Sequence, residues 1–202
     1  MRTFDRISRR GLALLLENVV ADVPYLPLPD GVRIAPFAGP DWTPFLALTT
    51  EKRLEKFRKR IARGRECLVA WRDERPVGFT WISRRMDPDI ETYALPLPAD
   101  AAYHWDLYVA SAERGSGLGT ALANYRLQHT RDSYRLGWRL IDVDNGASQK
   151  TAQRTASPST RVLGELRYLS LGGRSWSSFT PEIRDPRAIR VRDLLTRAGQ
   201  GA

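Results

Sequence analysis

A glycine-rich turn between a predicted strand and a predicted helix constrains this chain more than any other feature. Residues 105–109 read Trp-Asp-Leu-Tyr-Val, an aromatic and β-branched run that favours a strand. Apolar residues at positions 118, 121, 122 and 125 recur at the spacing of one helix face. Between these segments, residues 114–119 read Arg-Gly-Ser-Gly-Leu-Gly. Glycines let a ligand approach the backbone, and the N–H groups at a helix start attract anions. The turn therefore predicts an anion site, most simply for phosphate.

Two common nucleotide motifs fail at named positions. A P-loop ends in Gly-Lys-Ser/Thr, but here Gly119 is followed directly by Thr120, with no lysine. A dinucleotide-binding turn needs a third glycine where Thr120 stands when the count begins at Gly115. The phosphate ligand is therefore expected to belong to another class.

The pattern Leu-x-Val, a short turn, Arg-Gly-x-Gly-x-Gly and a helix resembles the acetyl-CoA loop of the GNAT (Gcn5-related N-acetyltransferase) superfamily. The matching positions are Leu107, Val109, Glu113, Arg114, Gly115, Gly117, Gly119 and Leu122. The order of predicted elements over residues 32–180 is similar as well. The resemblance implies acyl transfer from acetyl-CoA, as co-substrate, to a primary amine of a small-molecule or peptide acceptor.

The resemblance also implies where the cofactor lies. The pantetheine arm would pair with the main chain of the strand, and the pyrophosphate would rest on the amides of the turn. Asn145 and Ser148, after the next strand, match a cofactor-adjacent element of the family, although an asparagine before glycine is also ordinary turn chemistry. The implied cofactor-binding residues are Leu107, Tyr108, Val109, Arg114, Gly115, Ser116, Gly117, Leu118, Gly119, Thr120, Asn145 and Ser148.

An amine must lose a proton to attack a thioester, so a carboxylate is expected near the cofactor strand. Asp106 and Glu91 are the candidates for this base. By strand alternation Asp106 should share a face with Tyr108, opposite Leu107 and Val109. The alternative for Asp106 is an ion pair with a neighbouring arginine, and the alternative for Glu91 is a surface charge. The amide of Val109 is the candidate donor to the developing oxyanion.

Many relatives place an acidic tyrosine seven or eight residues after the asparagine, where this chain has Ala152 and Gln153. Tyr168 is the candidate replacement for that proton donor, with Ser148 or solvent as alternatives and packing as a further reading of Tyr168. The missing tyrosine leaves a second hypothesis open. The chain could be a non-catalytic acyl-CoA-binding protein on the same fold.

The predicted fold is α/β (α+β), with a mixed, mostly antiparallel sheet of six to seven strands flanked by helices. The resemblance implies that the sheet is splayed between the cofactor strand, residues 103–109, and the next strand, residues 138–143. Residues 3–23 have apolar positions on one side and predict an amphipathic helix. The expected organisation is an N-terminal helix and proline-rich connector (1–31), the acetyltransferase-like domain (32–180), and a C-terminal helix and tail packed on it (181–202).

Shorter elements follow from local signals. Helices are expected at residues 41–49, 50–63, 117–133 and 148–155, and from residue 185 to about residue 197. Hairpins are expected at residues 66–71 with 76–83 and at 160–171 with 174–179, where Gly172-Gly173 marks the turn. Residues 84–101 form a long, proline-bearing insert. Its acids, Asp87, Asp89 and Glu91, suggest a cationic amine as the acceptor.

Composition limits the remaining possibilities. One cysteine and two histidines predict no disulfide and no metal site. The net charge of +9 indicates an arginine-rich solvated surface first, attraction of a phosphorylated cofactor second and a nucleic-acid-associated module third, without any specific nucleic-acid motif. No apolar run is long enough for a membrane span, so a cytoplasmic protein, monomeric or homodimeric, is expected.

Overall fold

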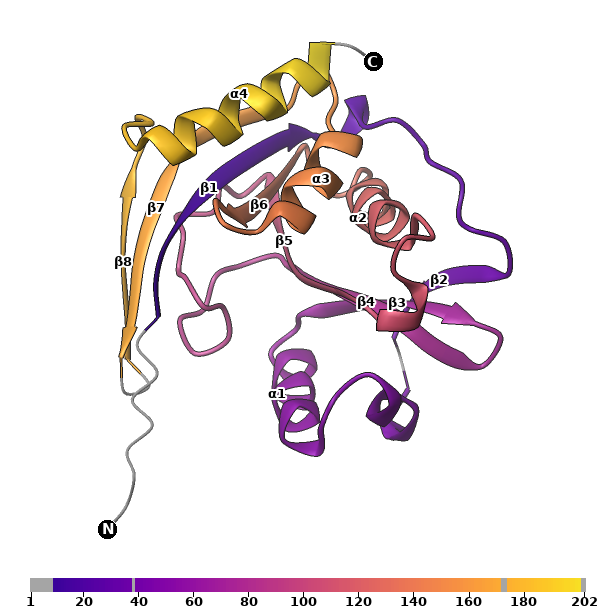
Figure 1. Ribbon diagram of the computed structural model, residues 1–202. Coiled ribbons are helices and arrows are strands. Elements are labelled where there is room, and N and C mark those ends of the chain that lie inside the picture. The colour runs from indigo at the N-terminus through magenta and orange to yellow at the C-terminus, as the bar shows by residue number, and fades with distance from the viewer. Residues whose placement is uncertain (1–8, 38, 172–173, 201–202) are drawn as a thin grey trace.

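The structure, a computed structural model, describes residues 9–37, 39–171 and 174–200 (Figure 1). Within these ranges a single sheet has the strand order β2-β3-β4-β5-β6-β1-β7-β8, and only the β5–β6 pair is parallel. This confirms the predicted mixed, mostly antiparallel architecture. The strands are β1 (Arg9–Val19), β2 (Val32–Pro36), β3 (Glu66–Arg72), β4 (Arg75–Ser83), β5 (Ala101–Val109), β6 (Leu136–Asp142), β7 (Arg161–Leu171) and β8 (Arg174–Thr180).

The N-terminal segment is a strand, and the helix predicted for residues 3–23 is wrong in the part that the structure describes. β1 lies inside the sheet, antiparallel to β6 on one side and to β7 on the other. Leu12, Leu14 and Leu16 pack beneath the helices, whereas Leu15 packs on the opposite face. A strand buried on both faces needs a continuous apolar run, and such a run also satisfies helix spacing. β1 raises the strand count to eight, above the expected six to seven. Residues 3–8 lie outside the described residues.

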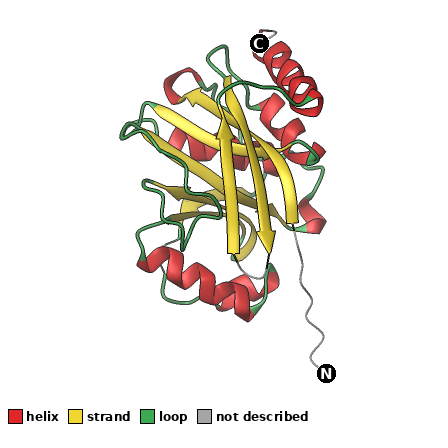
Figure 2. Ribbon diagram, turned by 90° about the vertical axis from the view of Figure 1, so that its left-hand side faces the viewer, coloured by secondary structure: helices red, strands yellow, loops and turns green. Residues whose placement is uncertain are grey.

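Helices cover both faces of the sheet (Figures 1 and 2). On one face, α2 packs against β4 and β5, and α4 packs against β1 and β7 beside α3. On the other face, α1 lies over β3 on an aromatic cluster that includes Phe45, Phe57, Phe79 and Trp81. The helices are α1 (Glu51–Ala62), α2 (Leu118–His129), α3 (Gly146–Arg154) and α4 (Pro186–Gln200).

Most of the short elements match their local signals. Gly64, with φ of 77°, ends α1 as expected. The hairpins form as predicted, although the Gly172-Gly173 turn lies outside the described residues. Asp41 does accept from the Thr43 amide at 2.8 Å, but only a short 3-10 helix, Thr43–Ala47, follows instead of the helix expected over residues 41–49. The insert between β4 and β5 is irregular, as predicted.

The sheet opens where the family resemblance implies that it should. β5 and β6 pair only between Ala101–Tyr103 and Leu136–Trp138, and the strands separate beyond that point. β5 also carries a bulge, since Phe79 pairs with Tyr108 while Trp81 pairs with Trp105, which leaves one extra residue on β5. The extra residue lies at or beside Asp106, whose own φ is 46°. The splay and the bulge together place β5 main chain and the Asp106 side chain beside an opening in the sheet.

Candidate active site

A cleft of about 630 Å³ follows the opening between β5 and β6 up to the glycine turn. Of the residues implied for the cofactor, Ser116 and Leu118 do not line it. Leu118 is buried beneath α2, and the Ser116 hydroxyl donates to the Glu113 carbonyl at 2.7 Å. The implied residues that do line the cleft are Leu107, Tyr108, Val109, Arg114, Gly115, Gly117, Gly119, Thr120, Asn145 and Ser148.

The glycine turn has the backbone that the sequence motif requires. Gly115 and Gly117 have φ of 88° and 86°, in the left-handed region where side chains are strained. No atom lies within 4 Å of the position that a Cβ would take at either residue, so backbone conformation, not crowding, demands glycine. α2 begins at Leu118, whose amide donates to the Ser116 hydroxyl at 3.4 Å, while the Thr120 amide donates to the Gly117 carbonyl at 3.0 Å. Gly117, Gly119 and Thr120 line the cleft, so the positive end of the α2 dipole lies beside it.

An ion pair fixes the start of this turn. The Arg72 guanidinium donates to both carboxylate oxygens of Glu113, at 3.1 and 2.9 Å, and to the Asp30 carbonyl at 2.7 Å. The hydrogen bond from Arg72 lowers the pKa of Glu113. This contact ties the strand β3 to the loop after β5, and it gives Glu113 a positioning role.

The main chain of β5 faces the opening. The Ala110 amide donates to the Val77 carbonyl at 2.9 Å, on the β4 side. Successive amides of a strand point to opposite edges, so the Val109 N–H points away from β4 and toward the splay. As predicted, Leu107 and Val109 pack toward α2 while Tyr108 packs toward α1.

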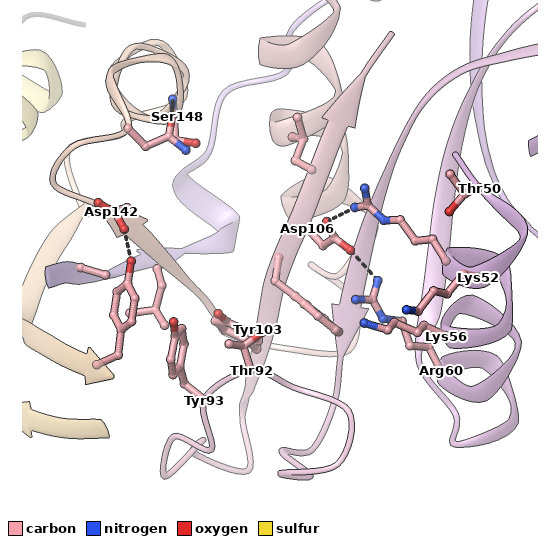
Figure 3. A pocket seen from close by; sticks show the side chains of 17 residues that line it. Thr50, Lys52, Lys56, Arg60, Thr92, Tyr93, Tyr103, Asp106, Asp142 and Ser148 are labelled. Atoms are coloured by element: carbon pink, nitrogen blue, oxygen red, sulfur yellow. Dashed lines mark hydrogen bonds and ion pairs between the residues drawn. The ribbon is translucent and has the colours of Figure 1, made fainter. Parts of the chain in front are cut away.

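A second hollow of about 650 Å³ adjoins the cleft on the α1 side (Figure 3). The two hollows share lining residues of β5 and of the segment after β6, among them Asp106, Leu107 and Asn145, so they adjoin where the sheet opens. In Figure 3, Lys52, Lys56 and Arg60 of α1 lie on one side of this pocket and Asp142 on the other. We refer to it as the α1 pocket.

Asp106 is an ion-pair partner of α1. Its carboxylate oxygens accept from Arg53 at 2.9 Å and from Arg60 at 2.5 Å. The Arg60 guanidinium also stacks on Trp105, 4.2 Å from the ring centroid. The ion-pair alternative raised for Asp106 is therefore present in the structure. Two arginines of α1 therefore face the site, although the net charge was expected to reflect chiefly a solvated surface.

Tyr168 lies across the α1 pocket from Asp106, and its hydroxyl donates to the Asp142 carboxylate. The ring lies over Gly11, its register partner on β1, where any Cβ would collide with it. The sequence analysis named Tyr168 but missed Asp142. An acid at the end of the strand after the cofactor helix was the available signal.

Glu91 is buried and does not line the α1 pocket. It binds Arg65 through two contacts of 2.7 and 2.8 Å and also accepts from Ser83 at 2.5 Å. Burial alone would raise the pKa of Glu91, but the hydrogen bonds from Arg65, Ser83 and the Asp87 amide outweigh it and lower the pKa. Asp87 pairs with Arg63 at 3.0 Å. The structure thus assigns Glu91 neither to a surface nor to the α1 pocket, whose charged wall is mainly cationic.

From the sequence, a lone histidine at a strand start such as His104 is a further possible base but is expected to be structural, and sequence reasoning missed the two arginines that accompany it at the closed end of the cleft. His104 of β5, Arg126 of α2 and Arg139 of β6 are buried and line the cleft. Nε2 of His104 shares a hydrogen bond of 3.3 Å with the Thr130 hydroxyl. Burial is the main cause that lowers the pKa of His104 well below its ordinary value, and the charges of Arg126 and Arg139 lower it further. In the ranges that the structure describes, no group of three metal-ligating side chains occurs, and no helix is long and apolar enough to cross a membrane.

Comparison with known proteins agrees with this geometry. The model of the acetyltransferase (GNAT) family matches residues 36–156. No curated protein matches the sequence. Similar solved structures include a protein of unknown function from Staphylococcus epidermidis (TM-score 0.56, 15% identity, 82% of this chain and 62% of that chain). A GCN5-related N-acetyltransferase from Sphaerobacter thermophilus has a TM-score of 0.54 and 13% identity, and the match covers 89% of this chain and 55% of that chain. A GCN5-related N-acetyltransferase from Kribbella flavida has a TM-score of 0.51 and 16% identity, with 84% of this chain and 60% of that chain covered. The chain thus spans less than two thirds of the length of these structures.

Proposed function

Because the chain belongs to the acetyltransferase (GNAT) family, we propose that it is an acyl-CoA-dependent N-acyltransferase that moves acetyl from acetyl-CoA to a primary amine. The observation that carries the proposal is the cleft itself. It runs from the glycine turn along β5 and adjoins a second pocket with room for another substrate.

In this proposal the cofactor extends from the turn into the opened sheet. The amides of Gly115 to Gly119 and the N-terminus of α2 bind the pyrophosphate. The pantetheine arm pairs with the β5 main chain. The Val109 N–H then lies beside the thioester, where a donor stabilises the negative oxygen of the tetrahedral intermediate.

The Asp142–Tyr168 pair is the proton-handling group that we assign. The amine nitrogen forms a bond to the acyl carbon and loses one proton to Asp142. The C–S bond breaks, and the thiolate takes one proton from the Tyr168 hydroxyl. The hydrogen bond between the two side chains returns the proton from Asp142 to Tyr168, so the pair ends unchanged. Asp106, whose oxygens are both engaged by arginines, holds α1 against β5 in this scheme.

The charge of the α1 pocket restricts the chemical class of the acceptor. Four cations face two carboxylates there, so an acceptor that carries an acidic group beside its amine is favoured over a polyamine. The cations are Lys52, Arg53, Lys56 and Arg60, and the carboxylates are Asp106 and Asp142. This reverses the expectation drawn from the acids of the insert.

Calorimetric titration with acetyl-CoA tests the cofactor assignment. We expect binding by the wild type and a loss of about a hundredfold in Gly117→Glu, because a side chain is strained at φ of 86° and a carboxylate would repel phosphate. Ser178→Glu, at an exposed position of the edge strand β8 that lines neither hollow, is the matched control for added charge. If the wild type does not bind acetyl-CoA, the proposal fails.

Thiol release with a panel of amines tests turnover. The panel comprises glutamate, a neutral alkylamine and spermidine, and we expect the acidic amine to react fastest. Tyr168→Phe should lower kcat by about tenfold to a hundredfold, with acetyl-CoA affinity retained. Tyr25→Phe, on an exposed side chain, is its control. Binding without thiol release from any amine would instead support the non-catalytic acyl-CoA-binding alternative.

A further inference from the structure

Two arginines at the closed end of the cofactor cleft are buried without a counter-charge. Arg126 and Arg139 are only 6% and 3% exposed. Each makes one side-chain contact, from Arg126 to Thr80 at 2.8 Å and from Arg139 to Thr155 at 2.9 Å. Within the described residues, Nε of both arginines and Nη2 of Arg139 have no hydrogen-bond partner.

The carboxylates that line the same cleft are committed elsewhere. Asp106 binds Arg53 and Arg60 on the α1 side, and Glu113 binds Arg72 at the mouth. The neighbouring His104 adds an unpartnered buried Nδ1 and supplies no negative charge. The closed end of the cleft therefore holds two positive charges with nothing described in the chain to neutralise them.

Such an arrangement is costly in a folded protein. A guanidinium does not shed its proton, so it cannot escape burial by becoming neutral. Buried charges are normally paired, and leaving one unpaired is strongly destabilising. An anionic group of a ligand, entering through the cleft that both residues line, would remove the cost.

The phosphates of the cofactor are poorly placed to be that group. Arg126 lies eight residues after Leu118, the start of α2, which is about 12 Å along the helix from the glycine turn. Arg139 directly follows Trp138, where the pairing of β5 with β6 ends, so it sits at the apex of the opening. Amide carbonyls of a pantetheine arm could accept hydrogen bonds here, but they would leave both charges uncompensated.

The unpaired atoms also indicate the shape of the group. Nε and Nη2 of Arg139 lie on one edge of the guanidinium, and together they form the fork that binds the two oxygens of a carboxylate. Nε of Arg126 adds a further donor from the helix side. This donor set matches a small planar anion.

We propose that Arg126 and Arg139 bind a ligand carboxylate at the closed end of the cleft. The inference rests on the proposed acyltransferase function and deepens it. The carboxylate has two sources. It is either the far end of the donor's acyl chain, which makes the donor a dicarboxylic acyl-CoA, or a free carboxylate that binds beside acetyl-CoA.

Calorimetry with succinyl-CoA and butyryl-CoA distinguishes these cases, because the two acyl chains have the same number of carbons and differ in the terminal charge. If the donor supplies the carboxylate, the wild type should bind succinyl-CoA about tenfold more tightly than butyryl-CoA, as expected for one charge-assisted contact. If the carboxylate is free, the two esters bind alike, and succinate binds to protein saturated with acetyl-CoA.

Substitutions of the two arginines test whether they are the residues that bind the carboxylate. Arg139→Met and Arg126→Met should abolish the succinyl preference, or the binding of succinate, while each still binds acetyl-CoA. Arg154→Met, which removes a cation that lines the same cleft, is the matched control. It should weaken both esters alike and leave their ratio unchanged.

The wild-type ratio alone keeps the proposal falsifiable if a variant does not fold. Equal binding of the two esters, together with no binding of succinate, would overturn the carboxylate site while acetyl-CoA binding still supported the acyltransferase. A preference that survives in both arginine variants would overturn it as well. Failure of every CoA ester to bind would instead refute the proposed function.

Discussion

Arg65 and Arg139 are equally buried, each 3% exposed, yet they have opposite surroundings. Arg65 makes two contacts with Glu91 and two more with the carbonyls of Arg63 and Arg85. Arg139 has one contact, with a threonine hydroxyl, and lines an open cleft. The difference shows that the burial of an arginine does not reveal its role, whereas the presence or absence of a counter-charge beside it does.

The first site is closed and serves the fold. The insert between β4 and β5 brings Glu91 against Arg65, and Ser83 and the Asp87 amide occupy the remaining carboxylate positions. Every strong donor there has an acceptor within the chain. The second site is open on the ligand side, as expected for a group that gains its partner on binding.

Breaking the closed pair should have the largest effect. Glu91→Gln leaves the Arg65 charge buried and unpaired, so we expect the free energy of unfolding to fall by about 3 kcal/mol. Urea unfolding at pH 7 measures this loss. Asp89→Asn, an exposed acid two residues away, is the control and should change stability little. A loss below that of the control would mean that the pair does not stabilise the fold.

The same pair should give a defined pH dependence. The pKa of Glu91 is lowered in the folded protein, so its stabilising contribution is present above the unfolded pKa and is lost as the pH falls. The difference in unfolding free energy between wild type and Glu91→Gln should therefore shrink as the pH is lowered from about 5 toward 3, because Glu91 has an unfolded pKa near 4.3. A difference that stays constant over this range would contradict the ion-pair explanation.

Arg139→Met should behave in the opposite way. Removing a buried charge that lacks a partner should leave stability unchanged or raise it by about 1 kcal/mol in the absence of ligand. Thermal and urea unfolding of the same preparation measure it. If the variant loses as much stability as Glu91→Gln does, Arg139 stabilises the fold as Arg65 does, and the proposed difference between the two arginines is wrong.

The smallest effect is expected at a partly exposed pair. Arg72 and Glu113 are 31% and 11% exposed at their side chains, so solvent screens their attraction. Glu113→Gln should reduce the free energy of unfolding by less than about 1 kcal/mol. Its consequence should appear in binding, because the glycine turn loses its anchor. We expect acetyl-CoA to dissociate faster from this variant in stopped-flow measurements. An unchanged dissociation rate would show that the glycine turn keeps its conformation without the Arg72–Glu113 contact.

Sequence reasoning worked best where interactions are local. The strand, turn and helix at residues 105–122 are contiguous, and Gly115 and Gly117 have the left-handed φ that the turn requires. It failed at β1, because a buried central strand and a buried helix face share the same apolar run. Only the pairing of β1 with β6 and β7, which lie more than a hundred residues away, distinguishes the two.

The groups that define the rest of the site are also non-local. Tyr168 meets Asp142, and Asp106 meets Arg53 and Arg60, across gaps of 26, 53 and 46 residues. Hydrophobic spacing carries no information about which charges become neighbours. Glu91 illustrates the limit, since an acid in a loop has the same local pattern whether it is exposed or locked onto Arg65.

The sequence by itself determined the family and the glycine turn, because the conformation of a turn and the period of apolar residues depend on neighbouring positions in the chain. Tertiary structure alone decided which charges are paired. Strand order and helix packing bring Glu91 to Arg65 and leave Arg126 and Arg139 beside a cleft whose carboxylates bind other arginines. They thereby separate an ion pair that stabilises the fold from two charges that have no counter-charge among the described residues.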